Sequence, residues 1–310
     1  MKNIIISRQN LGERIDKFLM RELFSNGEIS RGEIIRLINS GKVLVNQKET
    51  KPSYILKEND ELCILDIIQK EKKLKANQNI KIEIIFEDKN IIVINKPAGL
   101  QAHPGSRNEK DTLVNGLLHK FPEIRSVGED LLRPGIVHRL DKDTSGVMVI
   151  ARNQKTFEEL KRKFKDREVE KKYVALVYGH IIPKVGVIEK PIARASTYKK
   201  QVIAGKKTET RIRGAITEYR VLKSVGDFDL VEARPKTGRM HQIRVHLFSI
   251  GHPIVGDKLY KIKKCLSVPS VKRQLLHAKE LNFELFGQKY EFNVDPAEEF
   301  WLLDEKKIRR

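Results

Sequence analysis

A charged loop that runs directly into an apolar segment lies near the middle of the chain. Residues 135–146 read GIVHRLDKDTSG, and the apolar run VMVI follows at 147–150. An uninterrupted apolar run bounded by glycine and charged residues is typical of a strand buried in a sheet. The pattern therefore predicts a buried strand and places the carboxylate of Asp141 in a loop at its end, where functional side chains are often held.

Strand patterns dominate the chain from residue 80 onward. Strands are predicted at 81–87, 90–95, 146–152 and 173–178, and hairpins at 216–223 with 228–233 and at 281–285 with 290–294. Asn153 is expected to cap one helix, and Met240, Ile243, Leu247 and Ile250 form the apolar stripe of another. Many strands with a few interleaved helices predict an α+β domain with a mixed or antiparallel sheet over residues 80–305.

A smaller module is predicted at residues 12–66. Ile15, Phe18, Leu19 and Leu23 have helical spacing, and Ser30 begins a capping-box pattern before a second helix. The string GKVLVNQ at 41–47 then indicates a helix stop, a strand and a turn. Arg36 and Lys42 are among the basic residues of this unit. Residues 67–79, which are polar and rich in lysine, are predicted to be a linker.

The charge of the chain favours a polyanionic partner, most simply a nucleic acid. Lys and Arg number 61 against 41 Asp and Glu, which gives a formal net charge of +20. A generally basic but soluble surface is the alternative. No long uncharged apolar stretch or signal peptide stands out, and two distant cysteines make neither a disulfide framework nor a zinc pattern. We therefore expect a cytoplasmic monomer with no metal, no cofactor and no membrane contact.

The carboxylate of Asp141 admits several interpretations. A calcium loop beginning at Asp141 would need a bidentate Glu at residue 152, which is Arg152, so calcium is excluded. Glycosidase chemistry usually needs a second carboxylate, and Asp143 is expected to point elsewhere in an extended loop. A turn cap, a nucleophile and a general acid or base remain open at this stage.

A second polar cluster occupies residues 237–246, TGRMHQIRVH, at a predicted helix start. Arginine side chains at a helix N-terminus suit a phosphate or a catalytic carboxylate, which singles out Arg239 and Arg244. His241 and His246 are five apart and cannot share one face as a metal pair.

Two further positions are less specific. Tyr173 begins a strand after a charged run, where it can stack on a base or belong to the core. Lys96 ends a strand in a constrained turn, where it can contact phosphate or be merely exposed. His103 and His277 carry no separable signal.

Taken together, these strings resemble the RluA branch of the pseudouridine synthases. Residues 12–66 similarly resemble the small RNA-binding domain shared with ribosomal protein S-four. The strings that carry the first resemblance lie at 95–99, 138–146, 173–179, 237–246, 251–257 and 276–278.

The resemblance implies isomerisation of uridine in RNA. The glycosidic bond breaks, the base turns, and its carbon-5 joins the anomeric carbon, with no redox change, ATP or metal. Relatives with such an N-terminal domain mostly act on large-subunit (23S) ribosomal RNA, which is the expected substrate. Transfer RNA and a non-catalytic role in RNA binding or ribosome assembly are the alternatives.

The resemblance also implies roles for individual residues. Asp141 would be the essential carboxylate, and Arg244 would pair with it and keep it ionised. Tyr173 would stack on the base and serve in proton transfer, while Arg139 would fill the gap left by a flipped uridine. Leu276 would line the pocket. The other residues expected to contact substrate or RNA are His138, Lys96, Arg239, Arg36 and Lys42.

Overall fold

The computed structural model describes residues 2–24, 31–65, 74–105, 109–195, 200–205, 208, 210–262, 268 and 271–300. The chain divides into two compact units, residues 1–73 and 74–310. No helix among the described residues is long and apolar enough to cross a membrane.

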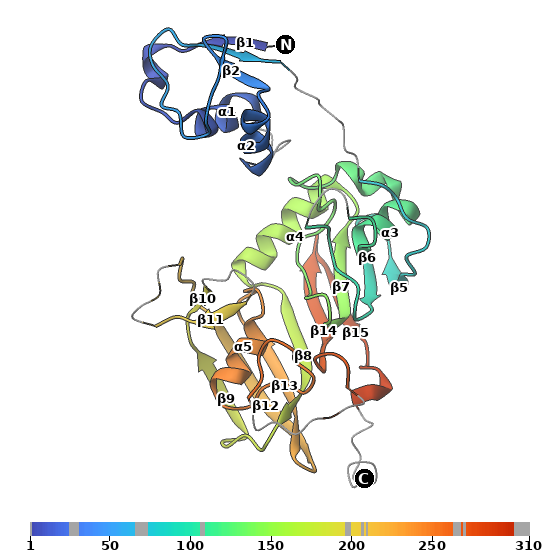
Figure 1. Cartoon of the computed structure of the whole chain (residues 1–310). Coiled ribbons are helices and arrows are strands. Elements are labelled where there is room, and N and C mark those ends of the chain that lie inside the picture. Colours follow the sequence, from blue (N-terminus) through green and yellow to red (C-terminus); the bar gives the residue numbers. More distant parts are fainter. Residues whose placement is uncertain are drawn as a thin grey trace. The chain divides into compact units, whose positions relative to one another are not determined.

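The first unit packs two helices on a small antiparallel sheet (Figure 1). Its strands β1, β4, β2 and β3 pair in that order, and its core includes Phe18, Leu19, Ile34 and Leu62. The helical spacing predicted from Ile15 to Leu19 is confirmed, whereas the predicted cap at Ser30 lies outside the described residues. The elements are β1 (Lys2–Ile5), η1 (Arg8–Asn10), α1 (Ile15–Phe24), α2 (Arg31–Asn39), β2 (Val43–Val45), β3 (Lys48–Glu49) and β4 (Glu61–Ile64).

The second unit is built on one large mixed sheet with the order β5-β6-β7-β14-β8-β13-β12-β9, to which β15 adds by pairing with β14. Its elements are β5 (Glu83–Glu87), β6 (Ile91–Lys96), α3 (Leu113–Lys120), η2 (Pro122–Ser126), β7 (Ser145–Ala151), α4 (Gln154–Asp166), β8 (Glu170–Tyr178), β9 (Val185–Glu189), β10 (Ile192–Arg194), β11 (Gln201–Ile203), β12 (Ile216–Val225), β13 (Phe228–Pro235), α5 (Gln242–Ser249), β14 (Leu276–Leu285), β15 (Gln288–Asn293) and η3 (Glu298–Phe300).

The sheet is mixed because β7 and β14 run parallel, whereas its other strand pairs are antiparallel. Both predicted hairpins form, as β12 with β13 and as β14 with β15. The predicted cap of α4 is also confirmed, since the side chain of Asn153 accepts a hydrogen bond from the backbone of Thr156 at 2.9 Å. The α+β class with a mixed sheet is therefore confirmed.

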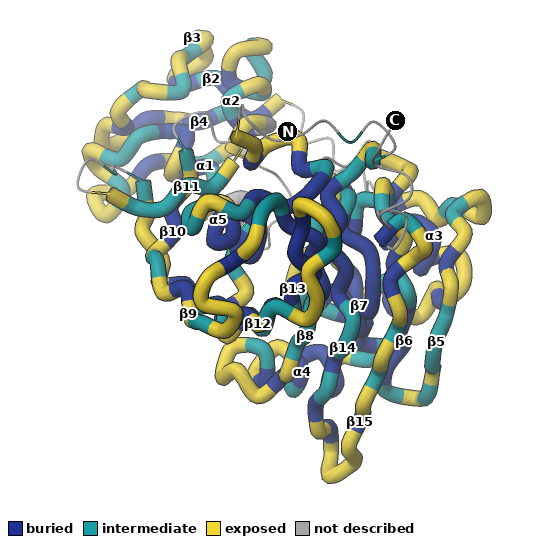
Figure 2. The backbone as a smooth tube through the Cα atoms, turned by 90° about the horizontal axis from the view of Figure 1, so that it is seen from below, coloured by how far each residue is buried: buried dark blue, intermediate teal, exposed yellow. Residues whose placement is uncertain are grey.

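Every residue of β7 is buried, as Figure 2 shows along its length. The strand needs glycine where it meets β14, because Gly146 has a φ of +118° and a Cβ there would lie 2.2 Å from the carbonyl oxygen of Ala278. On one side α4 packs against β7, and α5 packs against β12 and β13 farther along the sheet. The loop that carries Asp141 therefore enters a rigid central strand.

Two local predictions need correction. Residues 74–79 are not part of a linker, because Leu74 is buried and Asn115 of α3 hydrogen-bonds to the backbone of Lys75 and Asn77. The second unit therefore begins earlier than residue 80. Met240 also lies outside α5, since His241 before the helix has a left-handed φ of 55°.

Candidate active site

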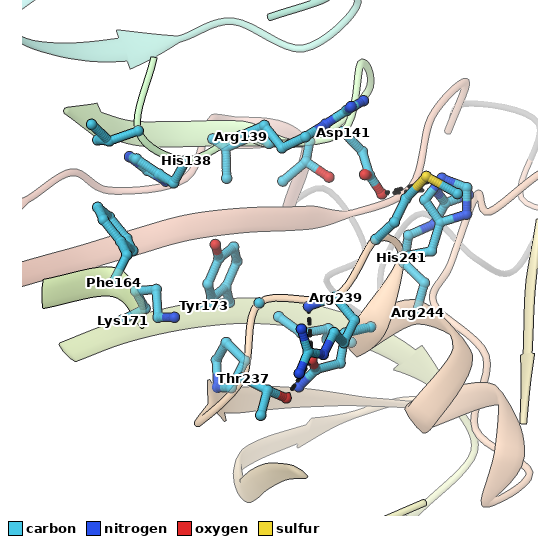
Figure 3. A pocket seen from close by; sticks show the side chains of 18 of the residues that line it. His138, Arg139, Asp141, Phe164, Lys171, Tyr173, Thr237, Arg239, His241 and Arg244 are labelled. Atoms are coloured by element: carbon cyan, nitrogen blue, oxygen red, sulfur yellow. Dashed lines mark hydrogen bonds and ion pairs between the residues drawn. The ribbon is translucent and has the colours of Figure 1, made fainter. Parts of the chain in front are cut away.

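A cavity of about 570 Å³ lies beside β8 (Figure 3). Its walls come from the loop before β7, the end of α4, the start of β8, the β13–α5 connection and the first residue of β14. Asp141 is the one carboxylate among the described residues that line it. The cations that line it are Arg133, Arg139, Lys165, Arg167, Lys171, Lys236, Arg239 and Arg244.

The loop that carries Asp141 is held at three successive residues. Lys96 donates to the carbonyl of Lys142 at 3.1 Å, Arg273 donates to the carbonyl of Asp143 at 3.2 Å, and Gln274 donates to the hydroxyl of Thr144 at 3.1 Å. Because the loop is bound by side chains from other segments, the position of its carboxylate is set by the tertiary structure. Asp143 does not line the cavity, so it offers Asp141 no carboxylate partner there.

The prediction that Lys96 contacts RNA is wrong. Its side chain is fully buried, and Nζ donates to the carbonyl oxygens of Pro97, Leu100 and Lys142. Burial lowers the pKa of the Lys96 ammonium to about 7, and the negative charges of Asp141 and Asp143 act in the opposite direction. Lys96 therefore ties the end of β6 to the Asp141 loop, and its ammonium is occupied by three carbonyl oxygens of the protein.

Arg244 pairs with Asp141, as predicted. Its Nη1 donates to Oδ2 of Asp141 at 2.9 Å, while Nε and Nη2 donate to the two carboxylate oxygens of Asp257 at 2.7 and 2.9 Å. The bidentate pair with Asp257 fixes the plane of the guanidinium and leaves one edge for Asp141. Asp257 itself is buried and also accepts backbone N–H bonds from Leu259 and Tyr260.

The Asp141 carboxylate is not a turn cap. Among the described residues it accepts from Arg244, and no backbone N–H donates to it. His241 places Nε2 3.8 Å from the same Oδ2, and its Nδ1 lies 3.2 Å from the hydroxyl of Tyr260. The acid is therefore held by side chains of the β13–α5 segment rather than by its own loop.

Two other residues of the 237–246 cluster, Gln242 and His246, anchor α5 to neighbouring segments by hydrogen bonds. Gln242 donates to the carbonyl of Ile216 and to the hydroxyl of Thr217, and its Oε1 accepts from Thr237. His246 is fully buried, with Nδ1 at Thr217 and Nε2 at the carbonyl of Lys190. These bonds satisfy the hydrogen-bonding groups of the Gln242 and His246 side chains. The sequence motif therefore contains both residues that line the site and residues with a structural role.

Tyr173 and Leu276 line the cavity from neighbouring strands, and both pack in one apolar cluster. Burial raises the pKa of the Tyr173 phenol, and the charge of Asp141 adds to the effect. The phenol is therefore protonated near neutral pH. A flat aromatic ring beside a buried leucine makes a surface on which a planar base can stack.

His138 lines the cavity, but its Nε2 is closed to RNA. The backbone N–H of Val149 donates to that nitrogen at 3.0 Å, and the ring stacks on Phe164 with centroids 4.7 Å apart. Burial lowers the pKa of His138 to about 3, and the charge of Lys171 acts in the same direction. The predicted RNA contact of His138 therefore does not involve this nitrogen.

The remaining predicted contacts occupy exposed or rim positions. Arg139 is exposed at the cavity, and Arg239 donates to the carbonyl of Gly214. Burial lowers the pKa of Arg239, and the charges of Arg213, Arg167 and Arg211 add to the effect. In the first unit Arg36 is exposed on α2 and Lys42 precedes β2.

Among the described residues, no group of three or more His, Cys, Asp or Glu is placed to hold a metal ion.

The second unit is expected to lose stability in acid. Burial lowers the pKa of His246, His277 and His138, whose nitrogens contact hydroxyl or backbone groups. As the pH falls below about 6.5, the unfolded chain takes up protons on these histidines that the folded chain resists, and for His138 this continues toward pH 3. For each such histidine the free energy of unfolding then falls by up to about 1.4 kcal/mol per pH unit.

Urea denaturation at pH 7 and pH 5 measures this slope. His138→Gln, which keeps an acceptor but does not titrate, is the matched variant and should show a shallower dependence on pH. A free energy of unfolding that is the same at pH 7 and pH 5 would contradict the lowered pKa values of these histidines.

Two family models match the chain. The model of RNA pseudouridylate synthases matches residues 90–249, and that of the S4 domain matches residues 13–62. The first match covers more than half of the chain. The chain belongs to the RNA pseudouridylate synthase family. The family resemblance and the N-terminal RNA-binding module predicted from the sequence are thereby confirmed.

Individual relatives agree with this assignment. This pseudouridine synthase is 42% identical over 267 residues to an uncharacterized RNA pseudouridine synthase of Aquifex aeolicus, with 85% of this chain and 80% of that protein covered. It is 34% identical to ribosomal large subunit pseudouridine synthase D of Zymomonas mobilis, over 97% of this chain and 96% of that protein.

A solved structure supports the fold of this pseudouridine synthase. Human RNA pseudouridylate synthase domain containing 1 has a TM-score of 0.57 and 29% sequence identity, with 72% of this chain and 86% of that chain covered. The predicted enzyme class is confirmed: the protein is an isomerase that acts on uridine in RNA.

Proposed function

We propose that this pseudouridine synthase modifies specific uridines of large-subunit ribosomal RNA, with Asp141 as its catalytic carboxylate. The observation that carries the proposal is a lone carboxylate, held by Arg244, in a cavity that eight Lys and Arg side chains also line. The name of the Zymomonas mobilis relative, which aligns over almost the whole chain, supports the choice of substrate. The enzyme would act in the cytoplasm as part of ribosome biogenesis.

The chemistry requires few groups. The bond between the anomeric carbon and N1 of uracil breaks, a bond from that carbon to C5 forms, and the proton of C5 is lost while N1 gains one. A carboxylate can attack the sugar or remove a proton, and Arg244 stabilises its negative charge in either case. The overall oxidation state of the substrate does not change, so the reaction needs no oxidant or reductant.

A base inside a helix cannot reach Asp141, so the target uridine must leave its stack. Tyr173 and Leu276 would receive the flipped base, and exposed Arg139 would occupy the space that it leaves. Arg239 and the other rim cations would hold the backbone phosphates. The first unit, with Arg36 and Lys42, would add affinity for the RNA.

Mapping of pseudouridine in total RNA tests the proposal. A strain that lacks the gene should lose pseudouridine at particular large-subunit positions and regain it with the wild-type gene. Purified enzyme should form pseudouridine at the same positions in unmodified ribosomal RNA. Loss of pseudouridine in transfer RNA alone would overturn the proposed substrate, and no loss in any RNA would overturn the proposed function.

Tyr173→Phe should slow catalysis while RNA affinity stays unchanged. The variant keeps the stacking ring but lacks the hydroxyl, which is protonated in the enzyme and lies in the cavity. We expect a decrease in kcat of about 10²-fold, the lower range for loss of a proton-transfer group. Tyr173→Leu, which loses the ring as well, should also raise KM. Equal kcat for Tyr173→Phe and wild type would show that the hydroxyl takes no part.

A further inference from the structure

His103 is a buried cavity residue for which the reaction described above has no role. It lies in the loop between β6 and α3, is 5% exposed and lines the same cavity as Asp141. Residues 101–103 are fixed by hydrogen bonds, since the side chain of Gln101 donates to the carbonyl of His103 and α3 donates backbone bonds to Gln101 and Ala102. The backbone that carries the imidazole is therefore fixed at the cavity wall.

The hydrogen bonds of this loop define which nitrogen carries the proton. Nδ1 of His103 lies 3.2 Å from the carbonyl oxygen of Pro104, and a carbonyl oxygen can only accept, so Nδ1 is the donor. Burial lowers the pKa of His103, and the charges of Arg133 and Arg139 act in the same direction. The ring is therefore neutral, and Nε2 presents a lone pair.

This lone pair has no hydrogen-bond partner among the described residues. The two other well-buried histidines differ, because His246 and His277 have partners at both ring nitrogens. A buried acceptor without a donor is unfavourable and is uncommon in folded proteins. In a substrate cavity, such an atom is suited to a donor that arrives with the ligand.

The chemistry of RNA narrows the choice of donor. Phosphate oxygens cannot donate, which leaves the ribose 2′-hydroxyl and the N–H groups of the bases. Arg133 and Arg139, which line the same cavity as His103, are suited to phosphates, and a ribose connects each phosphate to the next. An acceptor in a cavity that also holds these two arginines is suited to a sugar hydroxyl.

We propose that Nε2 of His103 accepts a hydrogen bond from a ribose 2′-hydroxyl of the bound RNA, which makes His103 a specificity-determining residue for RNA over DNA. The proposal rests on RNA being the ligand of this cavity, as the proposed function states. It assigns His103 no part in breaking or forming the glycosidic bond. The 2′-hydroxyl is the group by which proteins distinguish RNA from DNA at a given site.

Binding to three short oligomers of one length tests the proposal: oligouridylate, its 2′-deoxy counterpart and its 2′-fluoro counterpart, which keeps the RNA sugar pucker but cannot donate. Wild type should bind oligouridylate about five- to tenfold more tightly than the 2′-fluoro oligomer, the range for one hydrogen bond to a buried acceptor. His103→Phe should lose this preference, and His103→Gln, which keeps an acceptor oxygen, should retain part of it. The base is the same throughout, so any bond from His103 to a base cancels in the ratio.

Arg133→Gln is the matched control, because loss of a phosphate contact should weaken binding of all three oligomers equally. Thermal denaturation shows whether each variant is folded, and His103→Gln keeps the test decisive if His103→Phe is not. The proposal is overturned if His103→Phe or His103→Gln keeps the full wild-type preference, or if wild type shows none. Absence of pseudouridine formation by wild type would instead count against the proposed function, since the binding ratio does not depend on turnover.

Discussion

Asp141→Asn should abolish pseudouridine formation and leave RNA affinity unchanged. The amide has the shape of the carboxylate, but it can neither attack the sugar nor accept a proton. The fold should survive, because Arg244 keeps its bidentate pair with Asp257. We expect the single-turnover rate to fall by at least about 10³-fold, within the range for loss of a positioned acid or base.

Asp143→Asn is the control for this experiment. Asp143 lies two residues away in the same loop but does not line the cavity, so its variant should react at close to the wild-type rate. Rates of pseudouridine formation with enzyme in excess over RNA, together with RNA affinity, compare the variants. An Asp141→Asn enzyme that reacts as fast as wild type would remove Asp141 from the mechanism.

Asp257→Ala should destabilise the second unit and inactivate the enzyme. Arg244 is 5% exposed, and its Nε and Nη2 both donate to Asp257. Without that carboxylate, a buried guanidinium keeps Asp141 as its one acidic partner among the described residues. Removal of one member of a buried ion pair typically costs about 3–5 kcal/mol, and we expect a loss of that size in the free energy of unfolding.

Urea denaturation measures this loss, and two variants serve for comparison. Asp257→Asn retains one acceptor oxygen and should lose less stability. Asp295→Ala removes a carboxylate that is 84% exposed and faces Lys279, so its loss should be below about 1 kcal/mol. If Asp257→Ala were as stable as Asp295→Ala, the buried pair would not support the site in the way described.

Much of the local structure follows from short-range patterns. The apolar run after Gly146 is a buried strand, Asn153 caps α4, and the chain reverses between β12 and β13, as predicted. These features depend on side-chain periodicity and on hydrogen bonds between near neighbours. The predicted and observed bounds of the helices and strands differ by a few residues, because the ends of these elements depend on tertiary contacts.

The candidate site was predictable only in part. Asp141, Tyr173, Leu276 and Arg244 were singled out by motif resemblance, and the structure places all of them at one cavity. Asp257 was within a matching string, but nothing in its spacing showed that it would bind Arg244.

The sequence was misleading for Lys96, because a lysine after a strand is usually exposed. It gave no signal for His103, because a histidine in a loop can have many ordinary roles.

The sequence by itself determined the local elements, the two-module organisation, the excess of positive charge and the family motif around Asp141. Only the tertiary structure decided which polar groups meet. It buried Lys96 among three carbonyl oxygens, joined Arg244 to both Asp141 and Asp257, and left Nε2 of His103 without a partner among the described residues. The reason is physical: burial and hydrogen bonding depend on distances between segments far apart in the chain, whereas sequence patterns report on near neighbours.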